Sequence, residues 1–427
     1  MTKKRIGIVI LPLLAALGLG LLNAMTPFAS ADPGATSPIS TAIDQGHHHV
    51  QNDAAWTITA NTFTSQYPAG FTFSIQASSA AGPIVAASVE WVHRADRAGQ
   101  TRRIRRADAA IDAETGTITA VWAASQSDAV PPWVEVRYVW KLRDEAGNQY
   151  ETETTLAEYE DQSRTWIRTE TDEIIVISTG LSEAFNRTVI EAMESLREKY
   201  IAGWGDTLPY RPRVILFADR ADFDEWRIFS VDTSSLGYIL GGLTVPTWGG
   251  TVQVVTGEPE FLAYSIVPHE IEHLYQFEYL AKRTATTPGW FTEGDAVFYE
   301  THPQRFASVA EYVAQRVANN TIPALLDGEG PRVDGSDSLE GYYLGYTFMR
   351  WINDNWGIAK HKELMALLAT NMPFVEALEQ ALGMSKVEIE RAWRQSIGAT
   401  SDAPTLIPTW TPPAFLPSPT PFTFGNN

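Results

Sequence analysis

Two regions of the chain differ in the period at which apolar residues recur. Between about residues 54 and 160, apolar and polar residues alternate in short runs, as in 134–140, and turns such as 144–148 separate the runs. A period of two predicts half-buried strands. About seven short strands at this spacing are typical of an immunoglobulin-like β-sandwich. We therefore predict a β-sandwich domain over residues 51–162.

After Trp166 the period changes. Apolar residues from Phe185 to Leu196 recur at helical spacing, which predicts an amphipathic helix over 182–199, and a second helix is expected over 221–228. Apolar runs predict three strands, at 174–177, 214–217 and 251–255. From 258 to 399 the pattern is helical throughout. A small sheet followed by a helical half is an α+β arrangement, predicted over residues 163–399.

The first 31 residues have the pattern of a bacterial export signal. Lys3, Lys4 and Arg5 precede an apolar stretch over 6–22, and Ala-Ser-Ala at 29–31 is a small-residue cleavage pattern. We expect cleavage there, which makes the protein secreted or extracytoplasmic. If the segment is not cleaved, it would anchor the chain in the membrane.

Two further segments have a composition typical of unstructured chain. Residues 32–50 are rich in Ser, Thr, Gly and Pro and are expected to form a linker. It contains three consecutive histidines at 47–49, to which we assign no catalytic role. Residues 400–427 are rich in proline, which predicts an extended, disordered tail.

Composition limits the classes of function. The chain carries a formal net charge of -19, whereas nucleic-acid binding needs a basic surface, so we expect no nucleic-acid partner. There is no cysteine, so any metal must be held by histidine and carboxylate. A local arginine-rich run at 94–106 is compatible with docking to an anionic polymer or lipid surface, but a solvated hairpin is the favoured interpretation.

The residues with the clearest chemical meaning are His269, Glu270 and His273. Two histidines four residues apart lie on one face of a helix, where two imidazole nitrogens can share one ion. A glutamate directly after the first histidine can reach a water molecule bound to that ion. The H-E-x-x-H spacing therefore predicts a metal site in which Glu270 is the general base.

A catalytic zinc site needs a third protein ligand in addition to the two histidines. After a turn at 287–289, the segment 290–300 is predicted to form a helix that folds back against the first and carries Glu293. Two histidines and one glutamate form the ligand set of thermolysin. The predicted cofactor is therefore Zn²⁺, held by His269, His273 and Glu293.

Pro268 lies beside the motif and Glu272 lies within it, and we state what we expect of each. Pro268 directly precedes His269, so either the zinc-binding helix begins at Pro268 or a longer helix from Pro259 is kinked there. Glu272 adds a second carboxylate to the motif, and we expect it to point away from the metal.

With these motifs, the chain resembles the gluzincin zinc metallopeptidases, in particular bacterial proteins with a peptidase MA-like domain. Their pattern is a zinc helix, a turn and then a helix with Trp, an apolar residue, any residue, Glu, Gly, any residue and Ala. It stands here as WFTEGDA at 290–296, with 19 residues (274–292) between His273 and Glu293. The resemblance covers roughly residues 166–399 and implies a gluzincin metallopeptidase domain after the sandwich.

The resemblance implies further roles. In the aminopeptidase branch a Tyr-x-x-Gly pattern supplies a tyrosine that stabilises the oxyanion, which implies Tyr342, with Tyr343 and Tyr346 as rivals. A glutamate seven residues after the metal-binding one supports the site, which implies Glu300, and Asp295 is a weaker candidate for such support. That branch also has a Gly-x-Met-Glu-Asn segment, which is not found here, so the choice between endo- and exopeptidase stays open.

We therefore predict a zinc metallopeptidase in which Glu270 activates the zinc-bound water and a peptide or protein is the substrate. The strand at 251–255 is expected to pair with an extended peptide. Two alternatives stay open: a surface binding protein with a non-catalytic zinc domain, and a hydrolase of a non-peptide amide in the cell wall. His93, His302 and His361 are assigned no catalytic role. The sequence identifies no partner protein.

Overall fold

The computed structural model describes residues 56–93, 104–124, 130–226, 242–245, 248–280, 287–327, 330–333 and 339–403. The expected export signal, linker and most of the tail lie outside the described residues, as do the histidines at 47–49 and most of the arginine-rich run. None of the helices in the described ranges has both the length and the apolar character needed to cross a membrane.

Two antiparallel sheets pack against each other at the N-terminal end of the described chain. One has the strand order β1-β2-β6-β5, and the other has the order β4-β3-β7-β8, with β9 also pairing with β7. The strands are β1 (Trp56–Ser65), β2 (Gly70–Ser79), β3 (Ile84–His93), β4 (Arg105–Asp108), β5 (Ala110–Ile111), β6 (Thr117–Ala123), β7 (Glu135–Asp144), β8 (Gln149–Glu151) and β9 (Thr155–Glu158).

The alternation along β7 shows why this region forms a sandwich. Val136, Tyr138 and Trp140 are buried, and the residues between them are only half-buried. Successive side chains of a strand point to opposite faces, so these three face the core between the sheets, where they meet Phe71 and Phe73 of β2. The predicted strand-rich region is present, while the immunoglobulin-like assignment and the domain boundaries stay predictions.

A third sheet follows, with the order β10-β11-β12-β14-β13. The inner strands β11, β12 and β14 pair in parallel, and the two outer strands pair antiparallel to their neighbours. Its strands are β10 (Trp166–Glu170), β11 (Ile175–Thr179), β12 (Arg213–Phe217), β13 (Gly242–Val245) and β14 (Gly250–Val254). The predicted strands correspond to β11, β12 and β14, which agrees with the α+β class.

The expectation that the strand at 251–255 pairs with a peptide is wrong. This strand is β14, and its hydrogen-bonding edges are taken by β12 on one side and β13 on the other. The outer strand of the described sheet on this side is β13, a four-residue strand that the apolar pattern did not reveal.

Helices make up most of the remaining chain. Between the strands lie α1 (Glu183–Trp204) and α2 (Arg220–Trp226), close to the predicted bounds. After the sheet come α3 (Pro259–Phe261), the π-helical η5 (Leu262–Ile266), α4 (Val267–Tyr279), α5 (Gly289–Tyr299), α6 (Pro303–Ala318), α7 (Leu339–Trp356), α8 (Ile358–Ala369), α9 (Phe374–Leu382) and α10 (Lys386–Ser396).

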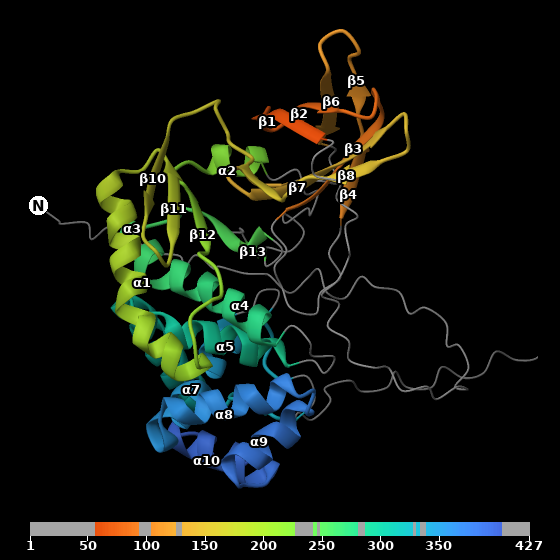
Figure 1. The fold of residues 1–427 in the computed structure, drawn as a ribbon. Coiled ribbons are helices and arrows are strands. Elements are labelled where there is room, and N and C mark those ends of the chain that lie inside the picture. Colours follow the sequence, from red (N-terminus) through yellow and green to blue (C-terminus); the bar gives the residue numbers. More distant parts are fainter. Residues whose placement is uncertain are drawn as a thin grey trace, which may run out of the picture.

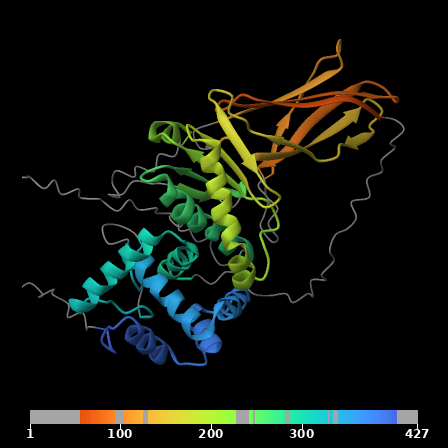
Figure 2. The same ribbon diagram turned by 90° about the vertical axis from the view of Figure 1, so that its left-hand side faces the viewer.

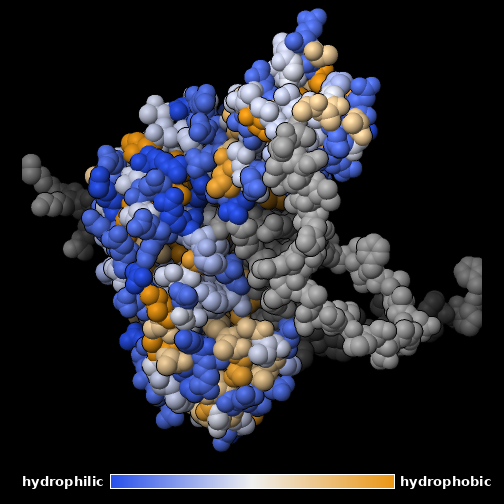
Figure 3. Space-filling view, viewed as in Figure 1, coloured by the Kyte–Doolittle hydropathy of each residue, from blue (hydrophilic) through white to orange (hydrophobic). Residues whose placement is uncertain are grey.

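Figures 1 and 2 show the β-sandwich at one end of the molecule and α8–α10 at the other, with the third sheet, α4 and α5 between them. The sandwich is joined to the third sheet by an apolar cluster in which Trp133 packs edge-on against Trp166, and Trp166 packs in the same way against Phe217. Arg213 of β12 also forms ion pairs with Glu158 (2.6 Å) and Glu135 of the sandwich. The outer surface is mainly hydrophilic on the face drawn in Figure 3.

Candidate metal centre

Helix α4 continues without interruption from η5 and α3, so the longer of the two expected helices forms. The N–H group of Val267 bonds to the carbonyl of Leu262, five residues back, which is a π-helical turn. Pro268 has no N–H group, and this wide turn accommodates it inside the helix. The carbonyl of Tyr264, four residues before Pro268, instead accepts hydrogen bonds from the N–H groups of Thr301 (2.8 Å) and His302 (3.1 Å).

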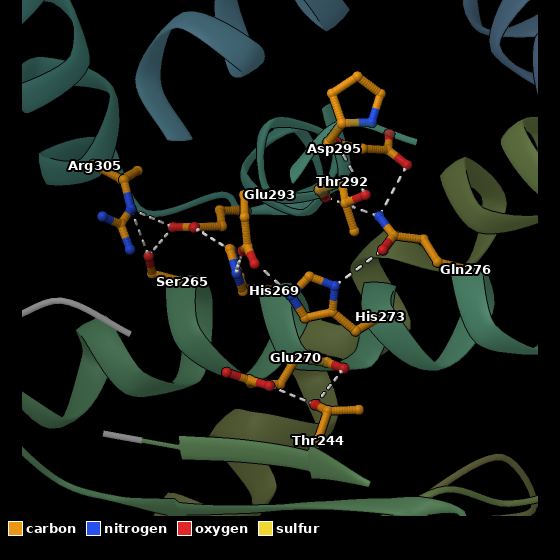
Figure 4. Close-up of polar contacts among 12 residues, drawn as sticks. Thr244, Ser265, His269, Glu270, His273, Gln276, Thr292, Glu293, Asp295 and Arg305 are labelled. Carbon is orange, nitrogen blue, oxygen red and sulfur yellow. Dashed lines mark hydrogen bonds and ion pairs between the residues drawn. The ribbon is translucent and has the colours of Figure 1, made fainter. Parts of the chain in front are cut away.

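The two histidines of the motif lie one turn apart on α4, and Glu293 approaches them from α5. The Nε2 atom of His269 is 3.1 Å and that of His273 is 3.4 Å from the same oxygen, Oε2 of Glu293. One ligand atom from each of the three residues lies within 4.8 Å of the others, and all three side chains are buried. Figure 4 shows the three side chains converging between the two helices.

The close packing of α5 on α7 brings a tyrosine to this centre. A Cβ atom on Gly294 would lie 2.2 Å from the carbonyl carbon of Gly345, and one on Gly345 would lie 2.0 Å from the carbonyl oxygen of Trp290. Only glycine permits this approach at both positions. Tyr342, one turn before Gly345, therefore stacks on His269, with ring centroids 5.7 Å apart and an interplanar angle of 12°.

The structure separates Tyr342 from its two rivals. Its hydroxyl is buried and has no hydrogen-bond partner among the described residues. Burial, together with the negative charges of Glu293 and Glu270, raises the pKa of Tyr342 well above its usual value, so the hydroxyl keeps its proton. Tyr343 contacts Tyr312, and Tyr346 stacks on Phe306, away from the two histidines.

The carboxylate of Glu300 contacts the ring nitrogen of His269 that does not face Glu293. Its Oε1 lies 3.0 Å from Nδ1 of His269, and its Oε2 accepts hydrogen bonds from Arg305 (2.6 Å) and Ser265. Burial alone would raise the pKa of Glu300, but the charge of Arg305 and the contact with His269 lower it, so Glu300 is a carboxylate. A carboxylate can only accept, so Nδ1 of His269 carries the hydrogen and Nε2 faces Glu293.

The helical turn at Pro268 helps to position Glu300. Thr301 and His302 follow Glu300 directly, and both bond to the carbonyl of Tyr264, which precedes the histidines on the same helix. The end of α5 is thereby tied to the start of α4. This contact, which sequence reasoning did not anticipate, accounts for the position of Glu300 next to His269, while the supporting role of Glu300 stays a prediction.

Charge at the centre favours a cation. Burial lowers the pKa of His269, but the contacts with Glu293 and Glu300 outweigh burial and raise it to about 10. The pKa of His273 is also raised, because Glu293 overcomes the effect of burial. The two imidazoles in turn hold the pKa of Glu293 far below its usual range, against the effect of burial.

Glu270 lies on the side of α4 that faces β13. Thr244 of β13 donates its hydroxyl hydrogen to this residue, either to the carboxylate Oε2 or to the backbone carbonyl oxygen 3.0 Å away. Figure 4 shows this contact below the histidines, next to the sheet. The predicted base is thus placed between the histidine pair and the outer strand.

Glu272 and Asp295 do not touch the three candidate ligands with their carboxylates. The indole Nε1 of Trp204 lies 3.0 Å and 3.2 Å from the two oxygens of Glu272, which points away from the centre as expected. Asp295 reaches His273 only through Gln276, whose Oε1 lies 3.0 Å from Nδ1 of His273. On its other side Asp295 contacts His361, at 2.9 Å.

Sequence reasoning missed several residues that hold the site together. Gln276 lies three residues after His273 and so one turn along α4, a spacing that could have identified it. Arg305 and Ser265 flank Glu300, and Thr244 lies in a strand too short to predict. His361 is distant in the chain from every residue of the centre, and no local pattern marks it.

Comparison with known proteins adds distant likenesses. No protein-family model matches the chain, and no curated protein is similar to it in sequence. An M1 zinc metallopeptidase from Deinococcus radiodurans is similar over 82% of this chain and 96% of that one, at 11% identity and a TM-score of 0.34. An aminopeptidase N family protein from Idiomarina loihiensis is similar over 81% of this chain and 72% of that one, at 10% identity and a TM-score of 0.32.

A two-domain M1 zinc metallopeptidase mutant bound to L-arginine is similar to the same extent, at 11% identity and a TM-score of 0.33 over 82% of this chain and 96% of that one. Likenesses at this level show neither a shared family nor a shared activity. The function is therefore inferred from the side chains of the centre.

Proposed function

We propose that the protein is an exported bacterial zinc metallohydrolase of the gluzincin type that cleaves peptide bonds. The supporting observation is that His269 and His273 turn their Nε2 atoms toward one oxygen of Glu293. Both Nδ1 atoms lie against oxygen atoms, from Glu300 and Gln276. In zinc sites the ligating histidine characteristically donates its other N–H group in this way.

The donor set fits zinc. Two imidazoles and one carboxylate leave a fourth position open, as catalytic zinc sites require. The raised pKa of both histidines, which the neighbouring carboxylates cause against the effect of burial, supports a site that favours positive charge. A bound zinc ion would supply a Lewis acid that lowers the pKa of a coordinated water to about 7.

The positions of three residues around the metal ligands support a role for each. The carboxylate of Glu270 takes a proton from the attacking water and passes it to the leaving amine. Thr244 holds that carboxylate from β13. The Tyr342 hydroxyl donates a hydrogen bond to the carbonyl oxygen as negative charge develops there.

The outer strand β13 is the proposed place for an extended substrate. Among the described residues it pairs only with β14, and its Thr244 contacts the proposed base Glu270. A peptide added along an outer strand forms backbone hydrogen bonds and has its scissile bond set by register. We further propose that the sandwich has immunoglobulin-like connectivity and that the signal is cleaved after Ala31.

The decisive experiment uses the mature chain, residues 32–427, with a proteome-derived peptide pool. We expect cleavage that a chelator abolishes and zinc restores, and loss of cleavage with zinc retained in Glu270→Gln. Zinc-bound protein that cleaves no peptide but releases amides from cell-wall fragments would change the substrate class. Bound zinc with no hydrolysis of either would favour the alternative of a binding protein.

A further inference from the structure

A continuous set of buried hydrogen bonds leads from His273 away from the candidate metal position. It runs from Nδ1 of His273 to Gln276, from Gln276 to Asp295, from Asp295 to His361 and from His361 to the carbonyl of Gly203. The links measure 3.0, 3.3, 2.9 and 2.9 Å. Four helices, α4, α5, α8 and α1, contribute to it.

The orientation of the Gln276 amide follows from its partners. One of them, 3.0 Å away, is the backbone carbonyl of Thr292, which can only accept a hydrogen bond. The amide nitrogen must therefore face Thr292, and its second hydrogen points to Oδ2 of Asp295. This leaves the amide oxygen toward His273, so Nδ1 of His273 must donate. Figure 4 shows Gln276 between His273 and the pair formed by Thr292 and Asp295.

This orientation decides the tautomer of His273. With the hydrogen on Nδ1, the lone pair of the neutral ring lies on Nε2, the atom that faces Glu293 at 3.4 Å. An imidazole in the other tautomer would present an N–H group to the metal position. Gln276 thus accepts a hydrogen bond from Nδ1 of His273, as Glu300 does from Nδ1 of His269.

Asp295 and His361 hold the amide in place from the far side. The carbonyl of Gly203 can only accept, so Nδ1 of His361 donates to it, and this fixes the ring with Nε2 toward Oδ1 of Asp295. Asp295 and His361 are buried, so water does not compete for these contacts. In the buried interior, a polar group of such a network that loses its hydrogen-bond partner lowers the stability more than it would at the surface.

We propose that Gln276 is a positioning residue for the metal ligand His273, and that His361 acts on the same ligand through Asp295 and Gln276. The inference rests on the proposed function, because it assumes that His273 binds zinc. It adds two residues to the site, and it implies that contacts made by helices α1 and α8 affect the affinity for the metal.

The test measures the zinc dissociation constant of the mature chain and its variants by competition with a chelator. Gln276→Leu is expected to weaken zinc binding by about 10- to 100-fold. His361→Leu should weaken it by a smaller factor, and His361→Gln, whose amide can also hydrogen-bond to Asp295, should restore most of the loss. Gln315→Leu, on the exposed face of α6, is the matched control and should not change the constant.

The double variant Gln276→Leu with His361→Leu separates positioning from general damage. If His361 acts only through Gln276, the double variant binds zinc as Gln276→Leu does. Multiplied losses, or Gln276→Leu with wild-type affinity, would overturn the proposal while leaving the proposed function intact. If Gln276→Leu does not fold, the comparison of His361→Leu with His361→Gln decides: rescue supports the proposal, and equal losses overturn it.

Two further results would also overturn it. One possible ligand atom from each of Glu272, Asp295 and His361 lies within 4.8 Å of the others, so a second zinc equivalent that His361→Leu removes would mean that these residues bind a cation instead. Wild-type protein without any zinc would refute the proposed function and this inference together. Thermal unfolding of the metal-free variants distinguishes lost affinity from lost fold.

Discussion

The backbone of Gly294 lies directly against that of Gly345, with no room for a side chain on either residue. Gly294 follows the candidate metal ligand Glu293, and Gly345 lies one turn after Tyr342. The contact between the two glycines therefore sets the distance between a metal ligand and the proposed oxyanion donor. It also gives a physical reason for the glycines in the two motifs on which the family resemblance rests.

Enlarging one of these glycines should separate the helices. A Cβ atom on Gly345 would come within 2.0 Å of the Trp290 carbonyl, so we expect Gly345→Ala to destabilise the fold by about 1–3 kcal/mol and to lower peptidase activity. Denaturant unfolding and a peptide assay check this. Gly257→Ala is the control, because nothing lies within 4 Å of the added atom; equal stability losses in both variants would contradict the packing argument.

Removing the Tyr342 hydroxyl should affect turnover rather than metal binding. The hydroxyl forms no regular hydrogen bond within the described residues, although Glu293 lies close to it. We expect kcat to fall about 100-fold or more, with the zinc dissociation constant unchanged. Tyr346→Phe should be close to wild type, since that ring stacks on Phe306 instead. A kinetic defect in Tyr346→Phe with none in Tyr342→Phe would reverse the assignment.

Support of His269 by Glu300 should appear in the affinity for zinc. Glu300→Gln keeps an oxygen that can accept from Nδ1 of His269, but it removes the negative charge that Arg305 holds in place. We expect zinc binding to weaken by about 10-fold or more. Chelator competition provides the measurement, and unchanged affinity would show that Glu300 only serves the packing of α5.

The dependence of zinc affinity on pH should extend to higher pH than for ordinary histidines. Zinc needs neutral imidazole, and Glu293 and Glu300 raise the pKa of His269 to about 10 against the effect of burial. Protons therefore compete with zinc throughout the range from pH 6 to 8.5, and affinity should still be rising at its upper end. Affinity that levels off near pH 7, after correction for the chelator, would contradict this.

The parts of the fold that follow local rules could be predicted. The alternation in β7 and the helical stripe of α1 each reflect one buried face, so the sequence pattern reports them directly. His269 and His273 share a helix face by their spacing alone. The convergence of Glu293 with them was predicted from the need for a third metal ligand and from the turn at 287–289, since no local rule brings α5 to α4.

Other parts depend on long-range contacts or on backbone geometry. The strand β13 has only four residues, and the first of them is a glycine. Such a strand is too short to show an alternation of apolar and polar residues. The sequence allows the helix that carries His269 to begin at Pro259 or at Pro268. The π-helical turn before Pro268 makes the longer helix possible. The contacts of Gln276 and His361 with Asp295 depend on the packing of α5 and α8, so the sequence alone does not reveal that these residues belong to the site.

The most direct test of the centre is the zinc content of the purified mature chain, compared with that of Glu293→Ala. Elemental analysis after dialysis against metal-free buffer should give about one zinc per wild-type chain and almost none in the folded variant. Wild-type protein without zinc, or a Glu293→Ala variant that retains a full equivalent, would contradict the assignment of these three ligands.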